Sequence, residues 1–168
     1  IGACGFTDAL TRLDIALCTD QMGAELSEEA RAYNKKIFAC MYWNALAMSV
    51  QLAIWRGKHE RFEDTEAAKG NLQFDLYEKY RNIRKHQNLP TWDAEMDVPI
   101  DPFEFGQEKY NLYDSDGELI HTINPSWGSL KEAIKRFGLR NSLLLTIMPT
   151  SNTATLCRTS ENVQVMDM

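Results

Sequence analysis

The feature that most constrains this fold is an apolar stripe that runs through residues 28–56. Its large apolar side chains recur every three or four residues, which predicts a single long helix. Ser27 stands where an N-cap belongs, Glu28 and Glu29 suit the positive end of the helix dipole, and Gly57 suits the position after the last turn. At 1.5 Å per residue, a helix of roughly 30 residues would be about 45 Å long. Because the stripe is wide, this helix should be buried on more than one side. The predicted stripe consists of Tyr33, Ile37, Met41, Ala45, Met48, Leu52 and Trp55, widened by Phe38, Tyr42 and Leu46.

The last third of the chain has the order of elements of an α/β protein. Ser129 and Glu132 match a capping box at the start of a helix, and Gly138 matches its end. Residues 142–148 are almost entirely apolar and are followed by Pro149, which is typical of a strand buried on both faces. A helix, a glycine, a buried strand and a polar loop in this order are typical of a parallel sheet or barrel. The sequence therefore predicts the α/β class.

The other stretches predict shorter elements. Residues 6–17 have helical spacing, and residues 75–85 are the best helical candidate in the irregular, charged stretch 58–110. Residues 110–113 and 118–123 flank the sequence Asp-Ser-Asp-Gly, which predicts a β-hairpin. The Asp-x-Asp-Gly pattern also begins calcium-binding loops, but the remaining EF-hand ligands and the terminal Glu are missing, so we interpret it as a turn.

Composition and charge argue against several classes of protein. The formal net charge is -6 and there is no dense Lys/Arg cluster, which argues against a nucleic-acid partner. The four cysteines form no Cys-x-x-Cys pair and have no histidine at zinc-finger spacing, so we expect small buried side chains, reduced thiols and no metal site. We find no signal peptide and no apolar run long enough to cross a membrane, so we expect a soluble cytoplasmic protein without a membrane partner.

The loop after the predicted strand, residues 149–155, is the best candidate for a binding site. Four of its residues carry small hydroxyl groups. If a helix begins near Ser151, its first N–H groups and its dipole would attract an anion such as phosphate, and the hydroxyls would add hydrogen bonds. Ligands of α/β barrels bind at the C-terminal ends of the strands, where this loop would lie. On composition alone, an ordinary turn explains the loop as well.

The run from Arg140 to Ala154, R-N-S-L-L-L-x-x-M-P-T-x-x-T-A, is similar to the signature of the large, catalytic subunit of class I ribonucleotide reductases. Other segments resemble the same family in the same order, namely residues 1–8, 27–38, 69–75 and 130–134. The resemblance covers most of the chain apart from approximately residues 76–128, where the hairpin looks like an insertion.

The resemblance implies that residues 1–168 are part of the ten-stranded α/β barrel of that subunit, with a long buried helix and an inserted β-hairpin. In this family the loop after the strand holds the diphosphate of the nucleotide substrate. Carried over residue by residue, the diphosphate contacts fall on Thr150, Ser151, Asn152 and Thr153. Asn152 stands where the cellular enzymes commonly have serine. Arg158 stands where the family has glycine, and the Glu-Pro that closes the family's next stretch is missing.

The resemblance also shows which parts of the family's chemistry this chain lacks. The reaction uses a radical cysteine in an Asn-x-Cys-x-Glu motif, a redox cysteine pair and a tyrosine pair, and none of these occurs in the sequence. We therefore assign no catalytic residue and no bound cofactor to this chain. The partners implied are the remaining sections of the large subunit with the radical cysteine, a small radical-generating subunit that holds a metal, and a ribonucleoside diphosphate. A thiol reductant would also be needed.

Two main functional hypotheses follow, and a third is that the chain is a structurally similar barrel piece of unrelated function. In the first, the chain is a section of a ribonucleoside-diphosphate reductase large subunit, from a split gene, a cleaved chain or a longer protein. Combined with its missing sections, it would reduce ribonucleoside diphosphates to deoxyribonucleoside diphosphates by radical chemistry, in the cytoplasm of a cell or of a virus-infected host. In the second, the chain is a non-catalytic, reductase-derived binding or interaction module. Asn152 and the altered stretch after Leu156 favour this alternative.

Overall fold

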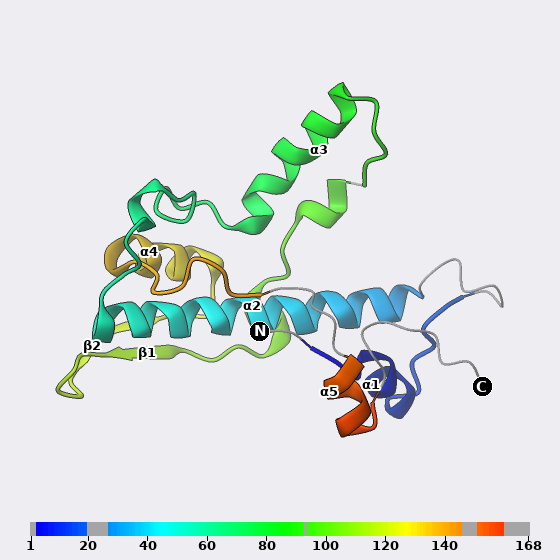
Figure 1. Cartoon of the computed structure of the whole chain (residues 1–168), viewed down its shortest axis with the longest axis horizontal. Helices are drawn as coiled ribbons and strands as arrows, with labels where there is room; N and C mark the ends of the chain where they lie inside the picture. Colours follow the sequence, from blue (N-terminus) through cyan, green and yellow to red (C-terminus); the bar gives the residue numbers. More distant parts are fainter. Residues whose placement is uncertain (1–2, 20–26, 93, 146–150, 160–168) are drawn as a thin grey trace. The chain divides into compact units, whose positions relative to one another are not determined.

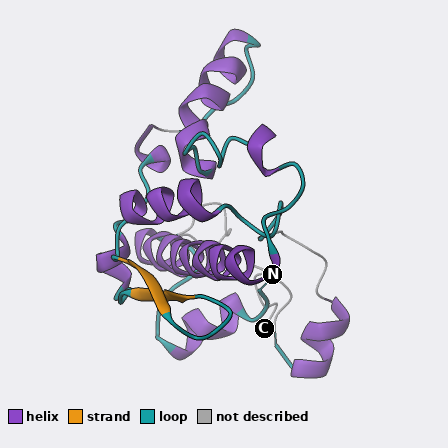
Figure 2. Cartoon of the chain, turned by 90° about the vertical axis from the view of Figure 1, so that its left-hand side faces the viewer, coloured by secondary structure: helices purple, strands orange, loops and turns teal. Residues whose placement is uncertain are grey.

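The computed structural model describes residues 3–19, 27–92, 94–145 and 151–159. The chain divides into two compact units, one formed by Ile1–Phe38 with Leu143–Met168 and the other by Ala39–Ser142. Most of the regular secondary structure in the described residues is helical (Figure 2). The strands of these residues form one two-stranded sheet.

The long helix predicted from the apolar stripe is α2, Glu28–Arg56 (Figure 1). Ser27 caps it, because the Ser27 Oγ accepts a hydrogen bond from the Ala30 N–H at 3.0 Å. Gly57 follows the last turn with a φ of 79°, a left-handed conformation that glycine adopts at little cost. Both predicted ends of the helix are confirmed.

The buried face of α2 differs from the predicted stripe. Met48 and Trp55 belong to that stripe, yet they are 41% and 45% exposed. The buried apolar side chains lie on an adjacent, partly overlapping face and include Trp43, Leu46, Ala47, Val50 and Ala53. Residues 37–54 are apolar around almost the whole circumference of the helix, so their spacing alone does not single out one face.

By length and composition, α2 is also apolar enough to cross a membrane, so the sequence-based statement that no apolar run is long enough was wrong. The core helix of a soluble protein passes the same test. Two polar side chains of α2, Ser49 and Gln51, are buried and form hydrogen bonds with Asn141 and Tyr113. These hydrogen bonds join α2 to other segments of the unit Ala39–Ser142, as expected for a core helix.

The predicted hairpin is confirmed. Strands β1, Tyr110–Tyr113, and β2, Leu119–Ile123, pair antiparallel, with Tyr110 opposite Ile123. In the turn, the Asp114 Oδ1 accepts hydrogen bonds from the N–H groups of Asp116 and Glu118, both at 2.9 Å. This carboxylate therefore stabilises the turn, as the interpretation of Asp-x-Asp-Gly as a turn requires.

The hairpin is fixed to α2 by a two-way hydrogen bond. The Gln51 Nε2 donates to the Tyr113 carbonyl at 2.7 Å, and the Tyr113 N–H donates to the Gln51 Oε1 at 2.9 Å. Leu112 of β1 and Ile123 of β2 are fully buried in the core of the same unit.

The stretch between α2 and the hairpin consists of loops and short helices, as predicted. Its α-helix is α3, Tyr77–His86, close to the predicted residues 75–85. The accompanying 3-10 helices are η1 Phe62–Asp64, η2 Gln73–Leu76, η3 Ala94–Asp97 and η4 Pro102–Phe105.

Helix α4, Trp127–Phe137, begins before the predicted capping box, so the assignment of that box to Ser129 and Glu132 was wrong. Ser126 is the N-cap, and its Oγ accepts a hydrogen bond from the Ser129 N–H at 3.1 Å. The Ser129 Oγ instead accepts from the Asn124 N–H at 2.9 Å. Gly138 ends the helix as predicted.

The buried strand predicted over residues 142–148 is not formed in its described part, residues 142–145. Leu143, expected in the core, is 88% exposed. A strand buried on both faces needs a neighbouring strand, and among the described residues β1 and β2 pair only with each other. Residues 146–148 lie outside the described residues.

The unit that contains both ends of the chain includes α1, Phe6–Arg12, and α5, Ser151–Cys157. Helix α1 is shorter than the predicted residues 6–17. Asp14 has a left-handed φ of 57°, and the Ile15 N–H bonds the Leu10 carbonyl at 2.9 Å, which ends the helix in a Schellman motif. Leu10 is buried, and the ring of Phe6 lies 6.5 Å from that of Tyr33 between centroids.

Candidate functional site

Three of the four residues predicted to bind phosphate, Ser151, Asn152 and Thr153, lie at the start of α5. This helix begins at Ser151, where the phosphate interpretation of the loop required a helix to begin. Thr153 is exposed on its first turn. Thr150 lies outside the described residues, and the side chains of Ser151 and Asn152 are not described. The structure thus places Ser151, Asn152 and Thr153 together on one helical turn.

The C-terminal end of α5 is held by a Schellman motif. The Thr159 N–H donates to the Ala154 carbonyl at 3.0 Å, and Arg158 between them has a left-handed φ of 53°. Arg158 stands where the resemblance places glycine, the residue that adopts this conformation most readily. The exit from the loop therefore keeps a turn that suits glycine, although the side chain differs.

Within the same unit, this exit packs against the segment before α1. The Thr159 Oγ1 donates to the Cys4 Sγ at 3.8 Å. A Cβ on Gly5 would lie 3.3 Å from the Thr159 Cβ, and Gly5 has a φ of 77°. Ala154, in the middle of α5, is 3% exposed. These contacts fix the C-terminal half of α5 and leave Thr153 exposed.

The segment that leads to the predicted strand is anchored in the other unit, Ala39–Ser142. The Arg140 N–H donates to the Ser49 carbonyl at 3.1 Å, and the Asn141 N–H donates to the Ser49 Oγ at 3.0 Å. The Ser49 Oγ donates in turn to the Asn141 Oδ1 at 3.1 Å. The Arg140 guanidinium reaches the carbonyl of Gly57 at 3.3 Å. The first two residues of the signature are thus attached to α2.

Gly138, directly before this segment, is required for a close approach. Its φ is 82°, and a Cβ there would lie 2.8 Å from the Cβ of Lys58. The neighbouring Leu139 carbonyl accepts a hydrogen bond from the His59 N–H at 3.0 Å. A side chain at position 138 would therefore push α4 away from the segment after α2.

Two segments of the family resemblance, residues 69–75 and 130–134, meet in this unit. The Lys131 Nζ lies 2.7 Å from the Asp75 Oδ1, and the Leu72 N–H donates to the Asp75 Oδ2 at 2.6 Å. The Phe74 ring lies 5.1 Å from the Lys131 Nζ and 4.8 Å from the Trp127 ring. These segments therefore hold α4 against η2 and have a structural role.

Tyr42 of α2 joins this cluster. Its hydroxyl accepts a hydrogen bond from the Gln73 N–H at 3.3 Å, and its ring lies 6.1 Å from that of Trp127. Burial raises the pKa of the Tyr42 hydroxyl above its ordinary value, and the hydrogen bond from Gln73 opposes that rise. The half-buried Tyr42 hydroxyl therefore stays protonated and accepts the hydrogen bond from Gln73.

The cysteines are free, as predicted, but they are less buried than predicted. Cys157 is exposed, and Cys4, Cys18 and Cys40 are half-buried. Across the described part of the chain, no group of three or more His, Cys, Asp or Glu side chains is placed to hold a metal ion.

The comparison with protein families settles which family this arrangement belongs to. The model of the family described as "Ribonucleotide reductase, barrel domain" matches residues 1–166. The chain belongs to this family. The resemblance seen in the sequence is therefore confirmed, and the match covers both units.

Individual members of the ribonucleotide reductase family are similar over most of the chain. The ribonucleoside-diphosphate reductase large subunit of Trypanosoma brucei brucei is 28% identical over 170 residues, which cover 98% of this chain and 15% of that protein. That of Plasmodium falciparum (isolate Dd2) is 33% identical over 138 residues, 82% of this chain and 12% of that protein. That of Variola virus is 31% identical over 138 residues, 82% of this chain and 13% of that protein. The chain thus spans between 12% and 15% of the length of these curated relatives.

Sequence reasoning missed Ser49, which bonds the start of the ribonucleotide reductase signature, and the contact between Asp75 and Lys131, which holds α4 against η2. Ser49 lies in the apolar part of α2, and its hydrogen bond was not predicted. A lone serine in a buried helix usually has a hydrogen-bond partner. Asp75 and Lys131 were recognised only as parts of matching segments. Their opposite charges were the one available signal of a contact.

Proposed function

We propose that this chain is a section of the large subunit of a ribonucleoside-diphosphate reductase, and that Thr150, Ser151, Asn152 and Thr153 bind the diphosphate of its substrate. The match of residues 1–166 to the ribonucleotide reductase barrel-domain family carries this proposal. The similar proteins are named as ribonucleoside-diphosphate reductase large subunits, which indicates ribonucleoside diphosphates as the substrate class.

The chemistry of the loop suits a diphosphate. Helix α5 begins at Ser151, and the first N–H groups of a helix have no acceptor within it and face the positive end of its dipole. The hydroxyls of Thr150, Ser151 and Thr153 and the amide of Asn152 can donate further hydrogen bonds to phosphate oxygens. Residues 149–155 include no acidic side chain that would repel the ligand.

We further propose that the chain completes a ten-stranded α/β barrel with the remaining sections of the large subunit, and that the hairpin is an insertion into it. Residues 142–148 would pair with neighbouring strands supplied by those sections. Leu143 and Leu156 support this, because they are 88% and 85% exposed, and such apolar side chains are expected to be covered in a complete barrel.

The radical chemistry would come from partners. The missing sections would carry the radical cysteine, a small subunit would generate the radical with its metal, and a thiol would supply the reducing equivalents. Within this arrangement the chain itself binds and orients the nucleotide and holds no cofactor. The assembly would act in the cytoplasm, including that of a virus-infected host.

Kinetics of the assembled enzyme test the proposal. The chain is co-expressed with the other sections of its large subunit and with the small subunit, and the change Thr150→Ala, Thr153→Ala is introduced. Each lost hydrogen bond to a charged group is worth about 1.5 kcal/mol or more, so the two losses together should raise the KM for the ribonucleoside diphosphate about a hundredfold.

Thr91→Ala is the control, because it makes the same chemical change at an exposed threonine outside the loop. Its KM should stay within about twofold of the unaltered chain. Equal KM values for the double variant and the unaltered chain would rule out the assigned contacts.

The alternative, a non-catalytic reductase-derived binding or interaction module, is favoured by Asn152 and Arg158, which depart from the pattern that the resemblance implies. Native mass spectrometry of the protein purified gently from its source separates the two. A complex with a second polypeptide that contains Asn-x-Cys-x-Glu supports the reductase. A free chain of 19.3 kDa supports the alternative.

A further inference from the structure

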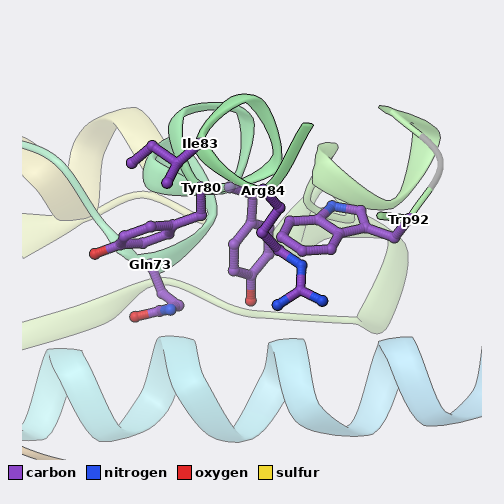
Figure 3. Close-up of a pocket in the computed structure, with 6 residues that line it drawn as sticks. Gln73, Tyr80, Ile83, Arg84 and Trp92 are labelled. Carbon is purple, nitrogen blue, oxygen red and sulfur yellow. The ribbon is translucent and has the colours of Figure 1, made fainter. Parts of the chain in front are cut away.

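A cleft beside α3 and a cleft at the turn of the hairpin offer different chemistry in the unit Ala39–Ser142. Aromatic rings line much of the first, and Arg84 is its one charged lining residue (Figure 3). The second has a volume of about 660 Å³ and lies between the end of α2 and the hairpin turn. Its lining includes both the hydroxyl-bearing Ser115 and the cation Arg56. An alcohol that can be modified and a positive charge therefore face the same space.

The turn of the hairpin is attached to the C-terminal end of α2 (Figure 1). The Trp55 Nε1 donates to the Asp114 carbonyl at 3.0 Å. The Asp114 N–H donates to the Glu118 carbonyl at 3.0 Å, which closes the turn around Ser115. Since Trp55 directly precedes Arg56, this contact fixes Ser115 beside the last turn of α2.

The Ser115 side chain is free to react. Ser115 is exposed, and its hydroxyl has no hydrogen-bond partner among the described residues. The space around the turn is open, because a Cβ added to Gly117 would meet no atom within 4 Å. The carboxylate of Asp114, and not Ser115, holds the turn through the N–H groups of Asp116 and Glu118. Modification of Ser115 therefore leaves the bonds of the turn in place.

The surroundings of Ser115 are acidic. Asp116 and Glu118 follow it by one and three positions, and both are exposed. Neither forms an ion pair with any residue whose side chain is described. Protein kinases choose their substrates partly by the pattern of charges around the acceptor hydroxyl. The two carboxylates thus favour a kinase with a basic substrate groove.

Arg56 can hold a phosphate on Ser115. It ends α2, its side chain is exposed, and no described carboxylate forms an ion pair with it. A phosphoserine carries a charge of about -1.5 to -2 at pH 7, and its oxygens form strong hydrogen bonds with a guanidinium. The carboxylates of Asp116 and Glu118 repel such a group, which favours its placement in the cleft toward Arg56.

We propose that Ser115 is a phosphorylation site for a serine kinase that recognises acidic residues, and that its phosphate pairs with Arg56. The Ser115 Oγ attacks the γ-phosphorus of a nucleoside triphosphate, and the bond from that phosphorus to the bridging oxygen breaks. The nucleoside diphosphate leaves, and the hydroxyl proton passes to the catalytic carboxylate of the kinase. The phosphate then ties the hairpin to the end of α2. This inference does not depend on the proposed binding of the substrate diphosphate.

Phosphorylation of the full chain by purified kinases tests the modification. The chain is incubated with ATP and either a kinase that recognises acidic residues or one that requires basic residues, and phosphopeptides are mapped by mass spectrometry. We expect the first kinase to add one phosphate, at Ser115, and Ser115→Ala to abolish it. Ser142 is the internal control, because it is also exposed and has no acidic neighbour in the sequence.

A matched pair of double variants tests the recognition by charge. Asp116→Asn, Glu118→Gln should slow the phosphorylation of Ser115 about tenfold. Glu104→Gln, Glu108→Gln removes two exposed carboxylates outside the turn, and the rate should stay nearly unchanged. Thermal unfolding of each variant verifies that the fold is intact.

A phosphorus nuclear magnetic resonance titration of the phosphorylated chain tests the pairing with Arg56. Because Arg56 favours the dianion, Arg56→Gln should raise the second pKa of the phosphoserine by about 0.3–0.7. Arg61→Gln, which removes an exposed guanidinium outside the cleft, should leave this pKa unchanged. The proposal is wrong if the first kinase leaves Ser115 unmodified or modifies Ser142 in its place. It is also wrong if both double variants react equally fast, or if Arg56→Gln does not raise the pKa.

Discussion

Replacement of Ser49 by alanine tests how the signature segment is attached to α2. The Ser49 Oγ accepts a hydrogen bond from the Asn141 N–H at 3.0 Å and donates one to the Asn141 Oδ1 at 3.1 Å. Ser49 is 1% exposed, so water cannot replace the hydroxyl at its own position. Ser49→Ala therefore removes both hydrogen bonds and leaves the helix otherwise unchanged.

The expected cost follows from these contacts. A buried group left without a partner costs about 1–3 kcal/mol. Alanine has a higher helix propensity than serine, which offsets this loss of stability by about 0.5 kcal/mol. Because Asn141 is itself exposed, water can satisfy part of its lost bonding, which places the net cost near the lower end of that range. We expect the free energy of unfolding to fall by about 1–1.5 kcal/mol, or Tm by about 2–6 °C.

Urea unfolding followed by tryptophan fluorescence is a suitable assay, because all four tryptophans lie within Ala39–Ser142. A double-mutant cycle with Asn141→Ala isolates the bond between the two side chains, with an expected coupling of about 0.5–1 kcal/mol. Ser115→Ala, in the exposed hairpin turn, is the control and should change stability by less than about 0.5 kcal/mol. Effects of Ser49→Ala and Asn141→Ala that add within about 0.3 kcal/mol would refute the hydrogen bond between the two side chains.

Three further changes test separate parts of the structure. Arg158→Gly should stabilise α5 by about 0.5–1 kcal/mol, because Arg158 has a left-handed φ of 53°, and slower hydrogen exchange of the Thr159 N–H would reveal it. Asp75→Asn removes the ion pair with Lys131 and should lower the free energy of unfolding in urea by about 0.5–1 kcal/mol, with a smaller loss at high salt. An unchanged urea midpoint would speak against this contact. Since burial raises the pKa of Tyr42, its contribution to stability is complete below about pH 10 and is lost as the pH rises through the folded-state pKa. Tyr42→Phe should therefore reduce the alkaline fall in Tm, although Tyr77 and Tyr110, whose pKa values burial also raises, will keep part of it.

The elements that the sequence predicted correctly are those with local determinants. Ser27 and Gly57 fix the ends of α2 through a cap and a left-handed residue, and Asp114 with Gly117 fixes the hairpin turn. Such signals lie within a few residues of the element that they define. No distant partner is needed to recognise them.

The predictions that failed required information from elsewhere in the chain or beyond it. The apolar run 142–148 needs neighbouring strands, and the described residues supply none for it. The face of α2 was misassigned because its middle is apolar on all sides. For α4, Ser126 and Ser129 both suit a cap, and only the hydrogen bonds decide between them.

For the candidate site, the phosphate interpretation of the loop depended on a helix that begins near Ser151, and α5 begins at that residue. The assignment of the diphosphate to Thr150, Ser151, Asn152 and Thr153 stays a prediction. Its basis is the family resemblance together with the hydrogen-bonding capacity of these residues.

The most direct test of the proposed function is a nuclear magnetic resonance titration of the assembled large subunit in which only this chain carries 15N-labelled threonine. If the loop holds the diphosphate, the amide signals of Thr150 and Thr153 will shift when a ribonucleoside diphosphate is added. The same signals will not shift when the corresponding ribonucleoside, which lacks the diphosphate, is added. Signals that stay unchanged while the assembly is saturated with the diphosphate would contradict the assignment of the substrate site to this loop.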